Sequence, residues 1–116
     1  MSNLAPKYTP TTFSEAKAIL DAKNKSAIPL CFATQLMHTA LGYAIVHHDT
    51  PIVTFIQNGE IYLNADGWSS RTTADRMHRF TPSNVRVNNR KGTLTVTVDD
   101  VVVGDATFGI TINPGK

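Results

Sequence analysis

One feature of the sequence restricts the possible folds of this chain more than any other. It is the strict alternation of apolar residues with threonine in the stretch TLTVTV, residues 93–98. Successive side chains of a β-strand point to opposite faces, so the leucine and valines share one face and the threonines the other. The same alternation appears in residues 84–89 and 106–112. We therefore predict three antiparallel strands in this region, joined by turns at Asn89–Gly92 and near Gly104–Asp105.

Strand patterns also fill the middle of the chain. Runs rich in apolar, β-branched and aromatic residues occur at 31–37, 41–48, 51–56 and 60–64. The dipeptide Asn58–Gly59 lies between the last two runs, and Asn-Gly favours the left-handed backbone of a short hairpin turn. These runs predict further antiparallel strands.

A helix is predicted before these strands, over residues 11–25. Thr12 followed by Glu15 is a capping-box pattern. Apolar residues then recur at helical spacing, at Phe13, Ala16, Ile19 and Leu20. Pro29 should prevent any continuation of the helix. The expected fold class is α+β: a small antiparallel sheet with an N-terminal amphipathic helix and a short central helix.

The short central helix is predicted in the segment NADGWSSRTTADRMHRFTP, residues 64–82. Asp66–Gly67 should form a turn, Thr72 should cap the helix, and Thr81–Pro82 should stop it. Three residues at spacings of four and three are expected to face the sheet, namely Thr73, Met77 and Phe80.

Length and composition fit one domain spanning residues 1–116, with an extended arm at 1–11 and a frayed tail at 113–116. The chain has 116 residues, of which 41% are hydrophobic and 17% charged. Neither a signal peptide nor an apolar run of about 20 residues is visible, so a protein of the host-cell cytoplasm, without a membrane segment, is expected. Cys31, in an apolar setting, is expected to be a buried and inert thiol.

No catalytic motif is present: the sequence lacks a Gly-x-Ser-x-Gly elbow, a His-Glu-x-x-His pair and a Walker loop. His47, His48 and Asp49 resemble a metal-binding run. Neighbouring residues on a strand point to opposite faces, however, so we expect two strand-end histidines beside a turn, with no metal and no cofactor. A protein that is not an enzyme is expected.

Anion binding is better supported, because the only tryptophan and three arginines fall within a dozen residues. Arginine binds phosphate through a planar fork of donors, and a helix start offers free N–H groups. An aromatic plane beside these donors suits a nucleotide base. The candidate ligand-binding residues are Trp68, Arg71, Thr72, Thr73, Arg76 and Arg79, with Tyr43 and Tyr62 as further stacking candidates.

Ordinary structural roles compete with this interpretation. A single tryptophan in a small domain is more often a core residue, and arginines on a short helix usually form a solvated face that Asp75 could partly neutralise. Tyr43 and Tyr62 on strands are more often packing residues than ligand contacts. The functional hypothesis therefore depends on the cluster and not on any single residue.

Residues 47–87 resemble a pattern found in small uncharacterised bacteriophage proteins. The pattern has a strand with Ile-Val-x-Phe, an Asx-Gly turn, a strand ending Leu-Asn, then Gly-Trp, Thr-Thr, arginines and an aromatic-plus-Pro exit. The matching residues are Ile52, Val53, Phe55, Asn58, Gly59, Leu63, Asn64, Gly67, Trp68, Thr72, Thr73, Arg76, Arg79, Phe80 and Pro82. Ser69 and Ala74 depart from it, because the family tends to carry basic residues there.

The resemblance implies a phage accessory protein that sequesters an anionic nucleotide, such as a cyclic dinucleotide or a related host immune signal, in the manner of an anti-defence sponge. One alternative is a nucleic-acid-binding phage regulator that uses the basic run from Arg71 to Lys91. Another is a protein–protein inhibitor of a host factor, or a minor structural protein, with Trp68 and the arginines as interface anchors. A homo-oligomer is expected, since small sheets with exposed edges often pair.

Overall fold

A computed structural model describes residues 8–31, 33–68 and 70–114, and it confirms the α+β class with an N-terminal helix and a short central helix. Most of the predicted arm lies outside the described residues, as do the last two residues of the tail. The elements are α1 (Phe13–Lys23), β1 (Ala27–Cys31), β2 (Thr34–His38), β3 (Gly42–His47), β4 (Thr50–Ile56), β5 (Ile61–Leu63), α2 (Arg71–Arg79), β6 (Val85–Arg90), β7 (Thr93–Val98), β8 (Val101–Asp105) and β9 (Ile110–Ile112).

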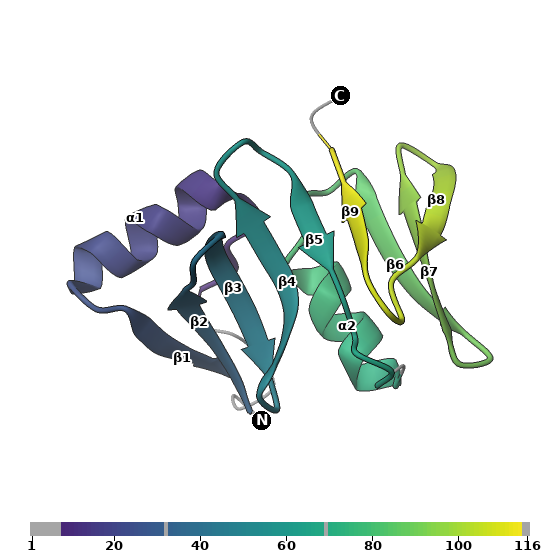
Figure 1. Ribbon diagram of the computed structural model, residues 1–116, viewed down its shortest axis with the longest axis horizontal. Helices are drawn as coiled ribbons and strands as arrows, with labels where there is room; N and C mark the ends of the chain where they lie inside the picture. The colour runs from purple at the N-terminus through teal and green to yellow at the C-terminus, as the bar shows by residue number, and fades with distance from the viewer. Residues whose placement is uncertain (1–7, 32, 69, 115–116) are drawn as a thin grey trace.

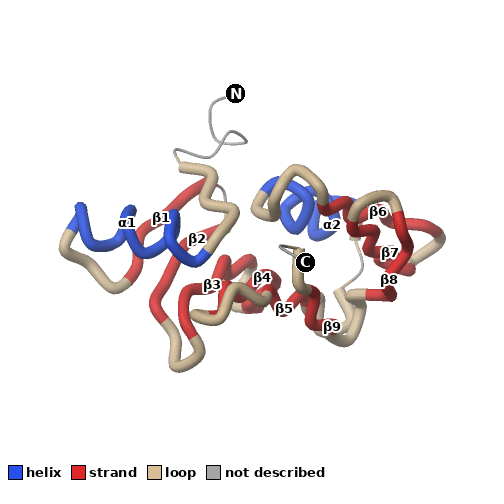
Figure 2. The backbone as a smooth tube through the Cα atoms, turned by 90° about the horizontal axis from the view of Figure 1, so that it is seen from above, coloured by secondary structure: helices blue, strands red, loops and turns tan. Residues whose placement is uncertain are grey.

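The strands form two antiparallel sheets (Figure 1). The larger sheet has the order β1-β2-β3-β4-β5-β9, and the smaller has the order β6-β7-β8. Helix α2 lies beside the larger sheet and against β6, as the view from above also shows (Figure 2). The core lies between these layers, and its two largest fully buried side chains are Phe55 of β4 and Phe80 at the end of α2.

Helix α1 begins as its capping pattern predicts. The Thr12 hydroxyl accepts a hydrogen bond of 3.2 Å from the Glu15 amide, and Asn24 ends the helix in the left-handed region. Ala16 and Leu20 are buried, so this face packs into the core. Among the described residues, neither helix is long and apolar enough to span a membrane.

The predicted strand at 31–37 is wrong in its extent. The chain forms a tight hairpin here: β1 ends at Cys31, Ala33 adopts a positive φ of 53°, and β2 starts at Thr34. Residue 32 lies outside the described residues. Pro29 stands within β1, which is possible because an edge strand need not donate from every amide. Cys31 is partly exposed and not fully buried as expected.

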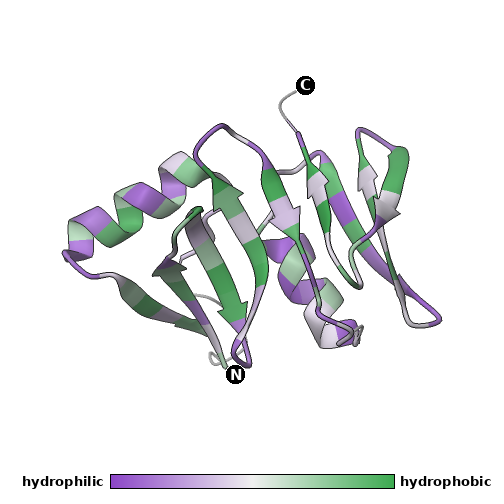
Figure 3. Cartoon of the chain, viewed as in Figure 1, coloured by the Kyte–Doolittle hydropathy of each residue, from purple (hydrophilic) through white to green (hydrophobic). Residues whose placement is uncertain are grey.

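The C-terminal region departs from prediction at β8. The expected turn at Gly104–Asp105 lies inside this strand, and the turn falls earlier, at Asp99 and Asp100, both of which have positive φ. The expected strand over 106–112 begins only at Ile110. Strand β8 is an edge strand of the smaller sheet and exposes three consecutive valines, 101–103. Most of this strand has the hydrophobic colour in Figure 3. The homo-oligomer stays a prediction.

A short segment between β8 and β9 joins the two sheets through its backbone. The Ala106 amide donates to the Leu94 carbonyl of β7 at 2.9 Å, and the Ala106 carbonyl accepts from Ala65, just after β5, at 2.9 Å. The Thr107 carbonyl accepts from Gly67 at 2.8 Å. The loop that follows β5 is therefore held by residues near the end of the chain.

Asp105 stabilises this junction as a carboxylate. Its Oδ1 accepts hydrogen bonds from the Thr107 hydroxyl at 2.6 Å, the Thr107 amide at 2.9 Å and the Leu94 amide at 3.2 Å. The side-chain and then the backbone hydrogen bond from Thr107 lower the pKa of Asp105 below its ordinary value of 3.8. The folded protein thus holds this proton more weakly than the unfolded chain does.

We expect Asp105→Asn to lower the free energy of unfolding at neutral pH by about 1–2 kcal/mol, because the amide accepts these bonds less well. The contribution of the Asp105 carboxylate to stability is fully present above pH 3.8, the ordinary pKa of the group. It is lost as the pH falls through the lower pKa of Asp105 in the folded protein. Urea denaturation at several pH values, comparing variant and parent, measures both effects. A difference that stays constant between pH 7 and pH 2 would contradict this role for the charge.

Candidate functional site

A pocket of about 490 Å³ lies between the end of the β3–β4 hairpin and the start of α2. Such a volume is in the range that small-molecule ligands occupy. Its lining combines apolar, hydroxyl and basic side chains: His47, His48, Thr50, Ile52, Ala65, Trp68, Ser70, Thr72, Thr73 and Arg76. Four of the eight sequence-predicted ligand residues are therefore brought together here.

Trp68 lines this pocket and is not a core residue, since 70% of it is exposed. It follows the predicted turn, in which Asp66 and Gly67 both take positive φ and Asn64 Oδ1 accepts from the Asp66 amide at 2.8 Å. Gly67 is required in this turn: its φ is +85°, and a Cβ there would lie 3.3 Å from the Phe108 ring. The loop thus presents the indole beside the pocket instead of burying it.

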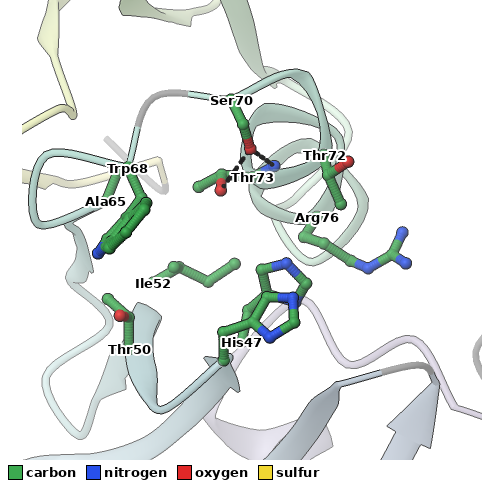
Figure 4. A pocket seen from close by; sticks show the side chains of 10 residues that line it. His47, Thr50, Ile52, Ala65, Trp68, Ser70, Thr72, Thr73 and Arg76 are labelled. Atoms are coloured by element: carbon green, nitrogen blue, oxygen red, sulfur yellow. Dashed lines mark hydrogen bonds between the residues drawn. The ribbon is translucent and has the colours of Figure 1, made fainter.

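The start of α2 supplies the hydroxyl side of the pocket. Ser70 caps the helix, and not Thr72 as predicted: its Oγ accepts from the Thr73 amide at 3.1 Å and lies 3.0 Å from Thr73 Oγ1 (Figure 4). The helix therefore starts two residues earlier than expected. The next two amides, of Arg71 and Thr72, have no acceptor within the helix, as at any helix start.

Ser70→Ala should lower the free energy of unfolding by about 1 kcal/mol, because it removes the cap of α2. Thr72→Ala is the matched control, and its exposed hydroxyl predicts a change within about 0.5 kcal/mol. Thermal denaturation by circular dichroism compares the two variants. The reverse order of stabilities would restore Thr72 as the cap.

Arg76 is the most unusual residue of the pocket, because only 4% of this cationic side chain is exposed. Its Nη1 lies 3.2 Å from Asp75 Oδ2, and its buried Nε has no hydrogen-bond partner among the described residues. Thr72 and Thr73 precede it by four and three positions, so all three share one face of α2. A buried donor without an acceptor is costly, and a bound anion would satisfy it.

His47 and His48 form the other wall, and the prediction that they face opposite ways is wrong. His48 is not a strand residue: it and Asp49 form the hairpin turn, with φ values of 49° and 67°. This left-handed backbone brings the two imidazole rings together, with centroids 4.4 Å apart. Among the described residues, no third His, Cys, Asp or Glu completes a metal-binding group.

His47 is largely buried, and its Nδ1 lies 2.9 Å from the Thr34 hydroxyl. Burial lowers the pKa of His47 below its ordinary value of 6.5, and the nearby His48 and Arg76 charges lower it further. A hydrogen bond with the Ala33 carbonyl opposes these effects. His47 is thus neutral at neutral pH.

The other four predicted residues lie away from this lining. Arg71 is exposed on α2, and Arg79 contacts Asp75 Oδ2 at 3.4 Å. Tyr43 is buried near the start of β3, at the other end of the strand from His47, and its ring packs 5.1 Å from that of Phe13. Tyr62 is half-buried on β5, where its hydroxyl approaches Gly109.

Sequence reasoning missed the hairpin side of the pocket. In the sequence, His47 and His48 resemble only a metal-binding run at a strand end, and no pattern marks Thr50, Ile52 or Ala65 as ligand contacts. The available signal was the dipeptide His48-Asp49 between two strand patterns, because a two-residue turn there would turn His48 away from the strand alternation.

The residues that resemble the bacteriophage pattern are spread over β4, β5, the turn at Gly67 and α2, which together form one wall of the pocket and part of the core behind it. Ile52, Trp68, Thr72, Thr73 and Arg76 belong both to the pattern and to the pocket lining. The phage relationship itself stays a prediction. No protein-family model, curated protein or solved structure matches this chain.

Proposed function

We propose that this protein binds an anionic nucleotide in the pocket between the β3–β4 hairpin and α2, and sequesters it without chemical change. The observation that carries the proposal is a pocket that combines an exposed tryptophan with a buried arginine whose Nε has no partner in the described part of the chain. An aromatic plane and a phosphate donor are the two features that a nucleotide requires.

Trp68 would supply the base-binding surface. Stacking of a base on an aromatic side chain is worth about 1–3 kcal/mol and tolerates every base, because each has a π-face. A solvent-exposed indole on a backbone-fixed loop loses little freedom when a base covers it. This explains why so large an apolar side chain is kept at the surface.

Arg76 and the start of α2 would hold the phosphate. Arginine stays charged in any accessible pH range, and its fork of donors matches phosphate oxygens. The N-terminal end of α2 adds the positive end of the helix dipole and the hydroxyls of Thr72 and Thr73. Asp75 Oδ2 lies 3.2 Å from Arg76 Nη1 and offsets part of its charge, so the phosphate would use the donors that this contact leaves, above all Nε.

Sequestration fits better than turnover. The described residues that line the pocket include no carboxylate and no thiol to serve as a nucleophile. The resemblance of residues 47–87 to bacteriophage proteins supports a host immune signal, such as a cyclic dinucleotide, as the natural ligand. A protein present in excess over such a signal would silence it by binding alone.

Isothermal titration calorimetry against cyclic dinucleotides, cyclic trinucleotides and ADP-ribose isomers tests the proposal, with quenching of Trp68 fluorescence as a second readout. We expect micromolar or tighter binding of at least one compound and full recovery of the intact ligand after heat release. Absence of binding across the panel would refute the proposal. Affinity that collapses steeply with salt, with a preference for polymers, would point to nucleic acid instead.

A further inference from the structure

The two ends of the pocket differ in chemistry. Figure 4 shows Trp68 on one side, His47 and Arg76 on the other, and Ile52 between them. The Trp68 end is aromatic and open to solvent, whereas Arg76 and His47 are both largely buried. Because the two ends of the pocket differ, a ligand with one apolar end and one charged end would bind in a single orientation.

The buried end holds little net charge when empty. Arg76 is positive, Asp75 contacts it at 3.2 Å, and burial beside Arg76 keeps His47 neutral. His48, from the hairpin turn, is the second imidazole, and the uncharged Thr34 hydroxyl of β2 lies 2.9 Å from His47 Nδ1. The corner therefore contains two imidazole rings and one fixed cation, Arg76, whose Nε has no hydrogen-bond partner among the described residues.

We propose that this basic corner, formed by His47, His48 and Arg76, is the phosphate subsite of the pocket, and that the base lies at the Trp68 end. This assignment rests on the proposed function and deepens it. It gives ligand-binding roles to two histidines, and it moves the phosphate away from Arg71 and Arg79, which do not line the pocket.

Proton uptake on binding follows from this placement. A phosphate beside His47 reverses the electrostatic balance, because a nearby negative charge favours the imidazolium. By linkage, protonation must strengthen binding by the same factor that binding strengthens protonation. The affinity for the ligand should therefore rise as the pH falls through 6.5, the ordinary pKa of histidine. At that pH, His47 of the free protein is still mostly neutral, because its pKa is lowered.

The test uses 3′,5′-cyclic AMP, whose phosphodiester keeps one negative charge between pH 5 and pH 8, so that any proton taken up goes to the protein. Adenosine is the matched neutral compound. Calorimetry at pH 6 and pH 8, in buffers of different ionisation enthalpy, gives the affinity and the number of protons bound. We expect cyclic AMP to bind at least about threefold more tightly at pH 6 than at pH 8. Uptake of one proton limits this increase to about tenfold per pH unit. The affinity for adenosine should not depend on pH.

His47→Gln should reduce the proton uptake and flatten the pH dependence, whereas His38→Gln, on β2 and outside the pocket lining, should leave both unchanged. Thermal denaturation of both variants checks that they fold. Binding of cyclic AMP with equal affinity at both pH values and no proton exchange would overturn the phosphate subsite and leave the proposed function standing. Binding of neither compound at either pH would also overturn the phosphate subsite, whereas the proposed function is refuted only by absence of binding across the panel of cyclic oligonucleotides and ADP-ribose isomers.

Discussion

Arg76→Met should weaken nucleotide binding by about 10- to 150-fold, which corresponds to about 1.5–3 kcal/mol for charge-assisted hydrogen bonds to phosphate. The same substitution should leave the free energy of unfolding unchanged or raise it. Methionine keeps the aliphatic volume of the stem, and it removes a buried charge whose Nε has no partner in the described structure. Loss of affinity without loss of stability is the expected signature of a side chain retained for its ligand.

Arg79→Met is the control for this experiment. Arg79 shares the Asp75 carboxylate with Arg76 and lies on the same helix, but it does not line the pocket. We expect the affinity of this variant to stay within about twofold of the parent, because a half-exposed charge outside the pocket lining is screened by solvent. Calorimetric titration measures binding, and urea denaturation measures stability. A strongly destabilised Arg76→Met variant would instead assign Arg76 a structural role.

Phe80→Ala should lower the free energy of unfolding by about 3–5 kcal/mol, the largest effect of any substitution considered for this chain. The Phe80 side chain is fully buried, and its amide closes α2 by donating to the Arg76 carbonyl at 3.2 Å. Alanine would leave a cavity at the point where α2 is anchored to the core. Urea denaturation followed by circular dichroism measures the loss.

Phe108→Ala provides the same chemical change at the surface. Phe108 is 79% exposed, so we expect its loss to change stability by no more than about 0.5 kcal/mol. The denaturant slope should stay similar in both variants, since neither changes the surface exposed on unfolding by much. Equal effects at the two positions would mean that the core does not depend on Phe80.

Most strands could be predicted because their alternation records which face is buried. In β7, Leu94 and Val96 are buried and Val98 is half-buried, as the alternation indicates. Strand β8 escaped prediction because Val101, Val102 and Val103 neither alternate nor become buried. The β1–β2 hairpin escaped because its turn uses Ala33 in the left-handed region, where Gly or Asn is the usual sequence signal.

The candidate site was predictable where it depends on one helix and unpredictable where it depends on packing. Thr72, Thr73 and Arg76 could be named as candidates from the sequence, because a helix start beside an arginine suits an anion. In sequence, however, Arg76 and Arg79 look alike, and only the approach of the β3–β4 hairpin to α2 buries the first and leaves the second half-exposed. The wall formed by His47 and His48 could not be predicted without the φ angle of His48, because its positive value reverses the expected direction of the His48 ring.

The junction between the sheets also sets the order in which the site can form during translation. The loop bearing Trp68 is fixed by acceptors at Ala106 and Thr107, roughly forty residues later in the chain. A nascent chain that has emerged only through β7 can pair β3 with β4 and form α2, but it cannot hold the tryptophan in place. Because closing so long a segment is slow, the binding surface should be the last part of the protein to become ordered on the ribosome.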